Sequence, residues 1–118
     1  MIEAAEPPPR AAKPLPPRVI ALVAQLNANP DAVTDEDLEQ LQIRGYDTYS
    51  RIRLPDLLPL VEPAIVEQAR AAFPDAPASQ AVVLRWHLRG LNFDLAVRKA
   101  RLAAQIEARK TAMVITRQ

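Results

Sequence analysis

The sequence predicts an all-α protein, a small bundle of four to five helices with a proline-rich extended N-terminal arm and a C-terminal basic αα-hairpin. Hydrophobic residues make up 49% of the chain, but aromatic residues make up only 4%, and there are 2 glycines. The apolar residues are therefore mostly alanine, leucine, valine and isoleucine in helical spacing, which favours helices. No segment alternates apolar and polar residues as a half-buried strand does.

At 118 residues the chain is long enough for one core and too short for two ordinary domains. We expect an arm or linker at 1–16 and a single helical domain at 17–118. The arm is rich in proline, whose fixed φ and missing amide donor favour an extended polyproline II conformation. The string from Lys13 to Arg18 looks like a proline-rich ligand, but a plain linker is the favoured interpretation.

The first two helices have clear start signals. We expect one helix from Pro17 to about Ala28, ended by Asn29-Pro30. The apolar residues expected on its inner face are Val19, Ile20, Val23 and Leu26. The next helix is expected to start at the N-cap Thr34 and to end at Gly45.

The start of this second helix carries two further signals. Asp37 lies at the capping-box position, and Val33 is placed to pack against Leu38. Four carboxylates follow the cap: Asp35, Glu36, Asp37 and Glu39. A metal site is one interpretation of this cluster, but acidic residues in a first turn also complement the helix dipole, and this second interpretation is favoured.

The middle of the chain is interrupted by proline. Residues 46–61 predict a short helix capped by Asp47 and then a buried connector, in which Pro55 and Pro59 exclude a continuous helix. Pro63 is expected to begin a third full helix that ends before Pro74. The residues expected on its inner face are Ile65, Val66, Ala69 and Phe73.

The basic helical hairpin is expected at 78–118. Ser79 is the predicted cap of its first helix, which would run to about Arg89, with Gly90 as the left-handed residue that ends it. Such an end brings Trp86 into contact with Leu91. Asn92 is expected to cap the last helix.

The last helix presents three faces. One carries a large apolar stripe of Leu91, Leu95, Leu102, Ile106 and Met113. This Leu91–Met113 stripe predicts either a core face or a partner face, including that of a homo-oligomer. A polar face carries Asp94, Arg98, Arg101, Gln105 and Arg109. Ala96, Ala100, Ala103 and Ala104 form a smooth side where another helix could approach closely.

The charges are divided between the two parts of the chain. The formal net charge is only +1, yet residues 1–77 carry seven basic and twelve acidic side chains, and residues 78–118 carry eight basic and two acidic ones. The C-terminal helices are therefore strongly basic, which indicates a surface for an acidic ligand. The candidate binding residues are Arg85, Arg89, Arg98, Lys99, Arg101, Arg109 and Lys110.

No catalytic set is visible in the sequence. The chain has no cysteine and one histidine, His87, which a packed position beside Trp86 explains better than a pH-sensitive contact. With Gly45 and Gly90 as the only glycines, a phosphate-binding glycine loop is excluded. We expect no enzyme activity, no cofactor and no metal.

The chain composition also indicates a location. Glu3 and Glu6 precede any basic residue, so a basic start followed by an apolar stretch, as in a signal peptide, is absent. The longest apolar run, 19–26, is far below the ~20 residues of a membrane-spanning helix. Without cysteine, a reducing compartment fits best. These features predict a cytoplasmic protein that does not enter a membrane.

Two function classes remain. The favoured hypothesis is an interaction module, such as an adaptor, inhibitor or assembly subunit, that binds an acidic protein surface, because the net charge is near zero and aromatic stacking residues are scarce. The alternative is a nucleic-acid-binding regulator that uses the same basic residues. A helix-turn-helix fits neither candidate turn: Trp86 is too bulky before Gly90, and Pro55 cuts short the helix after Gly45.

Overall fold

The computed structural model describes residues 15–43 and 47–116, with side chains up to Thr111. Within these residues the protein is all-helical and has no strand, as the sequence predicts, but it has six α-helices instead of the predicted four to five. The elements are α1 (Pro17–Ala28), a 3₁₀ turn η1 (Pro30–Ala32), α2 (Asp35–Glu39), α3 (Leu54–Leu57), a 3₁₀ turn η2 (Leu58–Leu60), α4 (Pro63–Ala72), α5 (Pro77–Leu88) and α6 (Phe93–Thr116). Of the predicted arm at 1–16, only Leu15 and Pro16 lie within the described residues.

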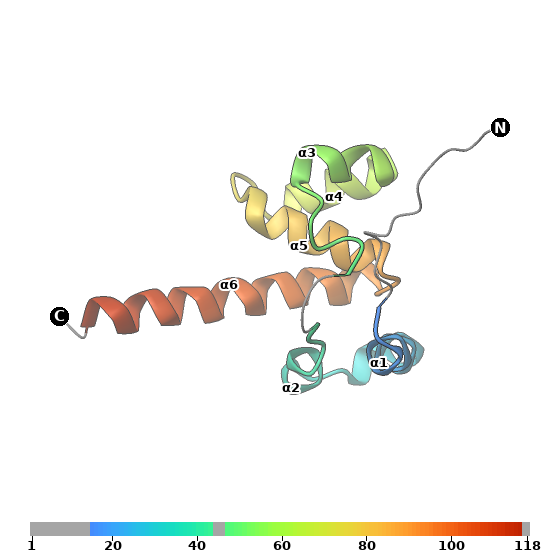
Figure 1. Cartoon of the computed structure of the whole chain (residues 1–118), viewed down its shortest axis with the longest axis horizontal. Helices are drawn as coiled ribbons and strands as arrows, with labels where there is room; N and C mark the ends of the chain where they lie inside the picture. Colours follow the sequence, from blue (N-terminus) through green and yellow to red (C-terminus); the bar gives the residue numbers. More distant parts are fainter. Residues whose placement is uncertain (1–14, 44–46, 117–118) are drawn as a thin grey trace.

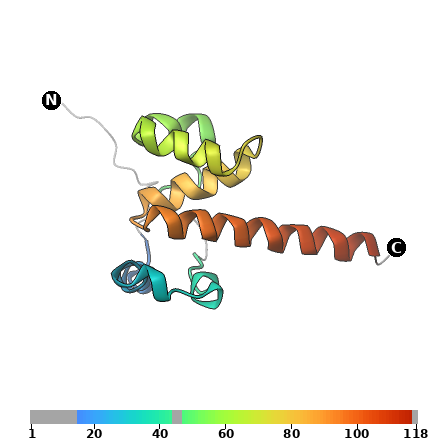
Figure 2. The ribbon, with the colours of Figure 1, turned by 180° about the vertical axis from the view of Figure 1, so that it is seen from behind.

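Helices α5 and α6 pack against each other and form the centre of the molecule (Figure 1). Helices α3 and α4 lie on the α5 side, whereas α1 and α2 lie on the α6 side, and the view from behind shows the same division (Figure 2). The second half of α6 continues past these helices (Figures 1 and 2). The core lies on both sides of the α5–α6 pair, and its largest fully buried side chains are Leu38, Leu41, Leu57, Leu84, Leu91, Leu95, Val19 and Val83.

Helix α1 has the predicted bounds but a narrower inner face. Val19, Val23 and Leu26 are buried, at the i, i+4 and i+7 spacing of one helical face. Ile20 was expected to join them, but it is 53% exposed. It directly follows Val19 in the helix, so its side chain points about 100° away from the buried face. The prediction for Ile20 is therefore wrong.

Helix α2 begins as predicted and ends early. Thr34 Oγ1 accepts a hydrogen bond from the Asp37 amide at 3.1 Å, and the Thr34 amide donates to Asp37 Oδ2 at 2.9 Å, which completes the capping box. The helix ends at Glu39, before the predicted end at Gly45, which lies outside the described residues. At this end of the helix a side chain satisfies a free backbone carbonyl: Gln42 Nε2 donates to the Glu39 carbonyl at 3.0 Å.

The segment after residue 46 forms a turn where a short helix is predicted. The Asp47 side chain accepts a hydrogen bond from the Ser50 amide at 3.0 Å, so it caps a turn over 48–51. The connector that follows splits into α3 and η2, each with a proline in its first turn. It is only partly buried, because Leu57 is fully enclosed while Leu60 is 52% exposed.

Helices α4 and α5 both begin with a proline. Helix α4 has the predicted start and end, with Val66 and Ala69 buried and Ile65 and Phe73 partly buried. Helix α5 begins at Pro77, two residues before the predicted cap Ser79, and has no side-chain cap. Proline suits the first helical position, because its φ already fits the helix and it leaves one fewer unpaired amide at the helix start.

The turn between α5 and α6 has the predicted left-handed end. Gly90 has a φ of 99°, its amide donates to the His87 carbonyl, and the Leu91 amide donates to the Trp86 carbonyl, both at 3.0 Å. Trp86 and Leu91 are both buried there. Asn92 then caps α6 as predicted, since its Oδ1 accepts from the amide of Asp94 at 2.9 Å.

Helix α6 changes its surroundings along its length. In its first half Leu95, Ala96, Ala100 and Leu102 are buried. Beyond them Ile106 is only partly buried, and the side chain of Met113 lies outside the described residues. The stripe predicted from Leu91 to Met113 therefore belongs to the core of this chain up to Leu102.

Candidate functional site

The seven basic residues expected to bind a ligand fall into two groups. Arg85, Arg89 and Lys99 line a cavity between α5 and α6. Arg98, Arg101, Arg109 and Lys110 lie on α6 outside this cavity and are partly or fully exposed. The candidates therefore do not form one continuous exposed stripe.

Arg89 forms a buried ion pair. Its Nε and Nη2 donate to Oδ2 and Oδ1 of Asp47 at 2.7 and 2.6 Å, and the two side chains are only 6% and 2% exposed. Ser50 completes the group: its hydroxyl donates to Asp47 Oδ1 at 2.6 Å and accepts from Arg89 Nη2 at 3.1 Å. These two parallel hydrogen bonds hold the turn over 48–51, which Asp47 caps, against the end of α5.

The electrostatics of Asp47 follow from this arrangement. Burial alone raises the pKa of the Asp47 carboxyl, but the hydrogen bonds from Arg89 and Ser50, together with the charge of Arg89, outweigh it and lower the pKa overall. Asp47 is therefore ionised at neutral pH. The guanidinium of Arg89 also lies 4.7 Å from the centre of the Trp86 ring, a cation–π contact.

Arg89, predicted as a candidate binding residue, is thus largely buried and paired within the chain. Sequence reasoning missed Asp47 and Ser50 as its partners because they lie about 40 residues earlier in the chain. The local sequence signal was limited to the turn-capping residue Asp47.

Arg85 is half-buried and incompletely paired. Its Nη2 donates to the Ile52 carbonyl at 2.8 Å, whereas its buried Nε has no hydrogen-bond partner in the described part of the protein. Burial lowers the pKa of Arg85, the nearby charge of Arg89 lowers it further, and Asp47 partly offsets both. Arg85 is therefore a cation whose surroundings contain too little negative charge to offset its burial and its repulsion by Arg89.

Lys99 is in a similar setting on α6. Its Nζ donates to the Leu38 carbonyl at 3.0 Å and lies 6.0 Å from the centre of the Trp86 ring. Burial lowers the pKa of the Lys99 amine, and the charge of Glu39 acts in the opposite direction. This hydrogen bond holds the end of α2 against α6.

We call the cavity around these residues the cation cleft. It has a volume of about 310 Å³ and is lined by Leu41, Ile43, Ser50, Val82, Arg85, Trp86, Arg89, Lys99 and Ala103. Three of these residues are cationic and none is acidic; Asp47 is already paired with Arg89, and Glu39 acts on Lys99 only through its charge. The cleft therefore combines excess positive charge with apolar walls.

The exposed cations lie further along α6. Arg98 Nη2 pairs with Asp35 Oδ1 at 3.1 Å, which links α6 to the acidic first turn of α2. We call the other three, Arg101, Arg109 and Lys110, the tail cations. Arg101 lies 5.6 Å from the centre of the Phe73 ring, and Lys110 is 4.0 Å from Glu107, at the limit of an ion pair. Among the described residues Arg101 and Arg109 form no ion pair.

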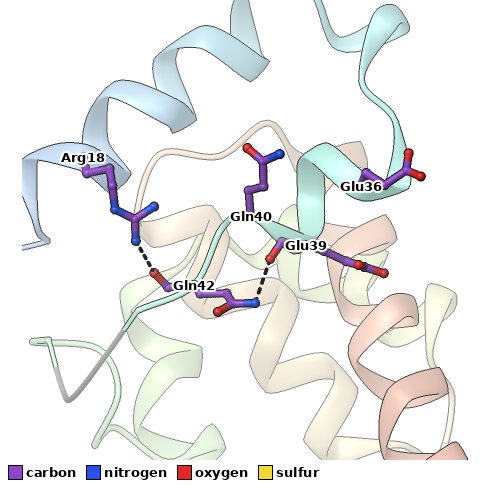
Figure 3. A pocket seen from close by; sticks show the side chains of 5 residues that line it. All are labelled: Arg18, Glu36, Glu39, Gln40 and Gln42. Carbon is purple, nitrogen blue, oxygen red and sulfur yellow. Dashed lines mark hydrogen bonds between the residues drawn. The ribbon is translucent and has the colours of Figure 1, made fainter.

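A wider polar depression of about 800 Å³ lies between α1 and α2 (Figure 3). Arg18, Glu36, Glu39, Gln40 and Gln42 line it. Arg18 Nη2 donates to the Gln42 carbonyl at 3.4 Å, and Gln42 in turn donates to the Glu39 carbonyl (Figure 3). These bonds hold α1 to the chain after α2, and the depression pairs no nucleophile with a base.

Two findings concern metals and membranes. No three histidine, aspartate or glutamate residues lie together as a metal would need, within 15–43 and 47–116. In the acidic turn of α2, Asp37 serves the capping box and Asp35 pairs with Arg98. Over the same ranges, no helix is both long enough and apolar enough to cross a membrane.

Comparison of the chain with models of known protein families, with curated proteins and with solved structures finds no match. The functional interpretation therefore depends on the two groups of cations, the cation cleft and the tail cations, and on the chemistry that each can perform.

Proposed function

We propose that the protein is a non-enzymatic interaction module that binds an acidic surface of a protein partner through the tail cations. The observation that carries this proposal is that Arg101 and Arg109 are exposed and lack an ion pair among the described residues. In this proposal α5 and α6 act together as the basic hairpin that the sequence predicts for 78–118.

The position of α6 supports this function. Its second half continues past the other helices (Figure 1), and nearly all side chains from Ala104 to Thr111 are exposed. Helices in proteins are stabilised mainly by packing of one face, which this half lacks within the chain. A partner that packs on this half would supply that stabilisation.

A surface suited to a partner helix lies beside the tail cations. Small residues on α5 and α6 border a shallow depression of about 430 Å³. Its lining is Ala78, Ser79, Val82, Ala100, Ala103, Ala104, Glu107, Ala108 and Thr111. Small side chains let a second helix approach closely, and the tail cations would then meet carboxylates along its edges.

The homo-oligomer predicted through the Leu91–Met113 stripe has little surface left. Leu91, Leu95 and Leu102 are buried in the core of the same chain. Of the described members, only Ile106 is partly available. A partner of different sequence and acidic charge is therefore the better-supported occupant of α6.

A protein ligand fits better than a nucleic acid for two reasons. The only tryptophan, Trp86, is 6% exposed and lines the cation cleft rather than the surface around the tail cations, so its ring is not placed to stack on bases bound there. The acidic first turn of α2 lies close to Arg98, and its exposed Asp35 and Glu36 would repel a continuous phosphate backbone. Nucleic-acid binding by the tail cations is the alternative, favoured by their exposure on one helix.

Affinity capture from the cells that make the protein tests this function. The variant Arg101→Gln, Arg109→Gln and Lys110→Gln removes the tail cations. A matched control, Arg18→Gln, Arg53→Gln and Arg70→Gln, removes three exposed charges from α1, the start of α3 and α4. We expect a protein to be captured by the wild type and the control, but not by the tail variant, with or without nuclease. Loss of the captured material on nuclease treatment would favour the nucleic-acid alternative.

A further inference from the structure

The cation cleft carries more positive charge than the carboxylates around it balance, because the partly buried Arg85 and Lys99 form no ion pair among the described residues. Asp47 is occupied by Arg89 and Ser50 through hydrogen bonds of 2.6 to 2.7 Å. Arg85 and Lys99, which line the same cavity, have only backbone carbonyls as hydrogen-bond acceptors in the described structure. Burying cations with this little compensation is costly, and a bound anion would offset the cost.

Both cations also keep donors for a ligand. A guanidinium has five N–H donors, and an ammonium has three. Arg85 gives Nη2 to the Ile52 carbonyl and Lys99 gives one hydrogen bond to the Leu38 carbonyl, so each side chain keeps further N–H donors. The two side chains come from different helices, α5 and α6, so a group between them can accept from both.

The walls of the cleft select among anions. Leu41, Ile43, Val82 and Ala103 contribute apolar side chains, and Trp86 contributes its ring. A doubly charged phosphate would lose hydration against these walls without enough donors to replace it. A carboxylate on an apolar stem satisfies both parts of the lining, and about 310 Å³ is enough for a small acid.

We propose that the cation cleft binds a carboxylate carried on a short apolar group, with the carboxylate between Arg85 and Lys99 and the apolar group against Trp86. A free small acid and the C-terminal residue of a peptide present the same chemistry. The cleft is separate from the tail cations, so this site stands or falls independently of the proposed function.

Nuclear magnetic resonance of the ¹⁵N-labelled full chain tests the ligand class, because Trp86 is the only tryptophan and gives a single indole N–H signal. The probes are phenylacetate, its neutral analogue phenylacetamide, inorganic phosphate, and an acetylated tripeptide that ends in leucine with a free or an amidated C-terminus. We expect saturable shifts of the indole signal with the carboxylates and none with the amides or phosphate. Tighter binding of phenylacetate identifies a free acid as the ligand, and tighter binding of the peptide identifies a protein C-terminus.

Variants locate the site. Arg85→Gln and Lys99→Gln each remove one charged donor, so the dissociation constant of the preferred carboxylate should rise about tenfold or more. Arg85→Lys and Lys99→Arg keep the charge and the fold while moving the donors, and should also weaken binding. Arg109→Gln removes the same charge from the tail and should leave binding unchanged. The proposal is overturned if no carboxylate gives a saturable shift, if the amides bind equally well, or if affinity survives the Arg85→Gln and Lys99→Gln changes.

Discussion

Asp47 and Arg89, which are 42 positions apart in the sequence, form an ion pair with two hydrogen bonds of 2.6 and 2.7 Å inside the protein. Asp47 caps the turn over 48–51, and Arg89 is the C-cap residue of α5. Because Arg89 also contacts Trp86, the pair joins the middle of the chain to the centre of the helical core.

The first prediction concerns the removal of this carboxylate. Asp47→Asn keeps the size of the side chain but leaves the Arg89 guanidinium buried without a counter-charge. We expect the free energy of unfolding to fall by about 3–5 kcal/mol, as for other broken buried pairs. Urea denaturation followed by circular dichroism measures this change.

A matched control removes a carboxylate from an exposed pair. Glu67 accepts a hydrogen bond from Arg70 at 2.9 Å, but both side chains are at least half exposed. Glu67→Gln should therefore cost less than about 1 kcal/mol. Equal effects of the two substitutions would show that the Asp47–Arg89 pair is not buried in solution.

The second prediction is a pH dependence that involves Asp47. The pKa of its carboxyl is lower in the folded protein than its ordinary value of 3.8, so ionised Asp47 stabilises the fold above that value. This contribution disappears as the pH falls through the folded-state pKa. The difference in unfolding free energy between wild type and Asp47→Asn should be constant near neutrality and shrink below about pH 4. Urea titrations at several pH values measure it, and a difference that grows on acidification would contradict the assignment.

Trp86 provides the third prediction. Its ring is 6% exposed, contacts Arg89 and Lys99, and packs at the turn between α5 and α6. Trp86→Ala should lower the unfolding free energy by about 3–5 kcal/mol, because a large cavity replaces the ring. Ile20→Ala, at a side chain that is 53% exposed, should cost far less. Thermal or urea unfolding compares them, and a near-zero effect at Trp86 would mean that the ring is on the surface.

Gly90 provides the fourth prediction. Its φ of 99° is unfavourable for any residue with a Cβ atom, although a Cβ at this position would meet only Val23 Cγ1, at 4.0 Å. The cost of Gly90→Ala is therefore backbone strain without a clash, and we expect a loss of about 1–2 kcal/mol. Asparagine tolerates left-handed conformations better, so Gly90→Asn should cost less than Gly90→Ala in the same urea assay. A stabilising Gly90→Ala would rule out this turn geometry.

Local sequence signals predicted the parts of the fold that depend on neighbouring residues. The Thr34 and Asn92 caps, the Gly90 turn and the prolines that begin α1 and α4 are each determined within one turn of helix. The predictions failed where distant contacts decide the outcome. The end of α2 is an example: the helix stops at Glu39, and the Leu38 carbonyl there accepts hydrogen bonds from the nearby Leu41 amide and from Lys99, 61 positions away.

The candidate site shows the same division. The excess of basic residues after position 77 is visible in the sequence, and five of them on α6 are exposed or partly exposed. The burial of Arg89 is not visible there, because helical spacing does not indicate that Asp47 from another part of the chain will reach it. The cation cleft is likewise formed by residues from four separate segments.

The fifth prediction tests the central claim, that the tail cations bind an acidic protein surface. Fluorescence anisotropy at physiological salt compares a labelled polyglutamate peptide with labelled random-sequence duplex DNA, using the wild type and the Arg101→Gln, Arg109→Gln and Lys110→Gln variant. We expect the peptide to bind the wild type and to lose its affinity for the variant, while the DNA binds no more tightly than the roughly micromolar affinity of non-specific complexes. Sub-micromolar binding of random-sequence DNA that weakens steeply as salt rises, together with no binding of the peptide, would contradict the claim and identify the tail cations as a nucleic-acid surface.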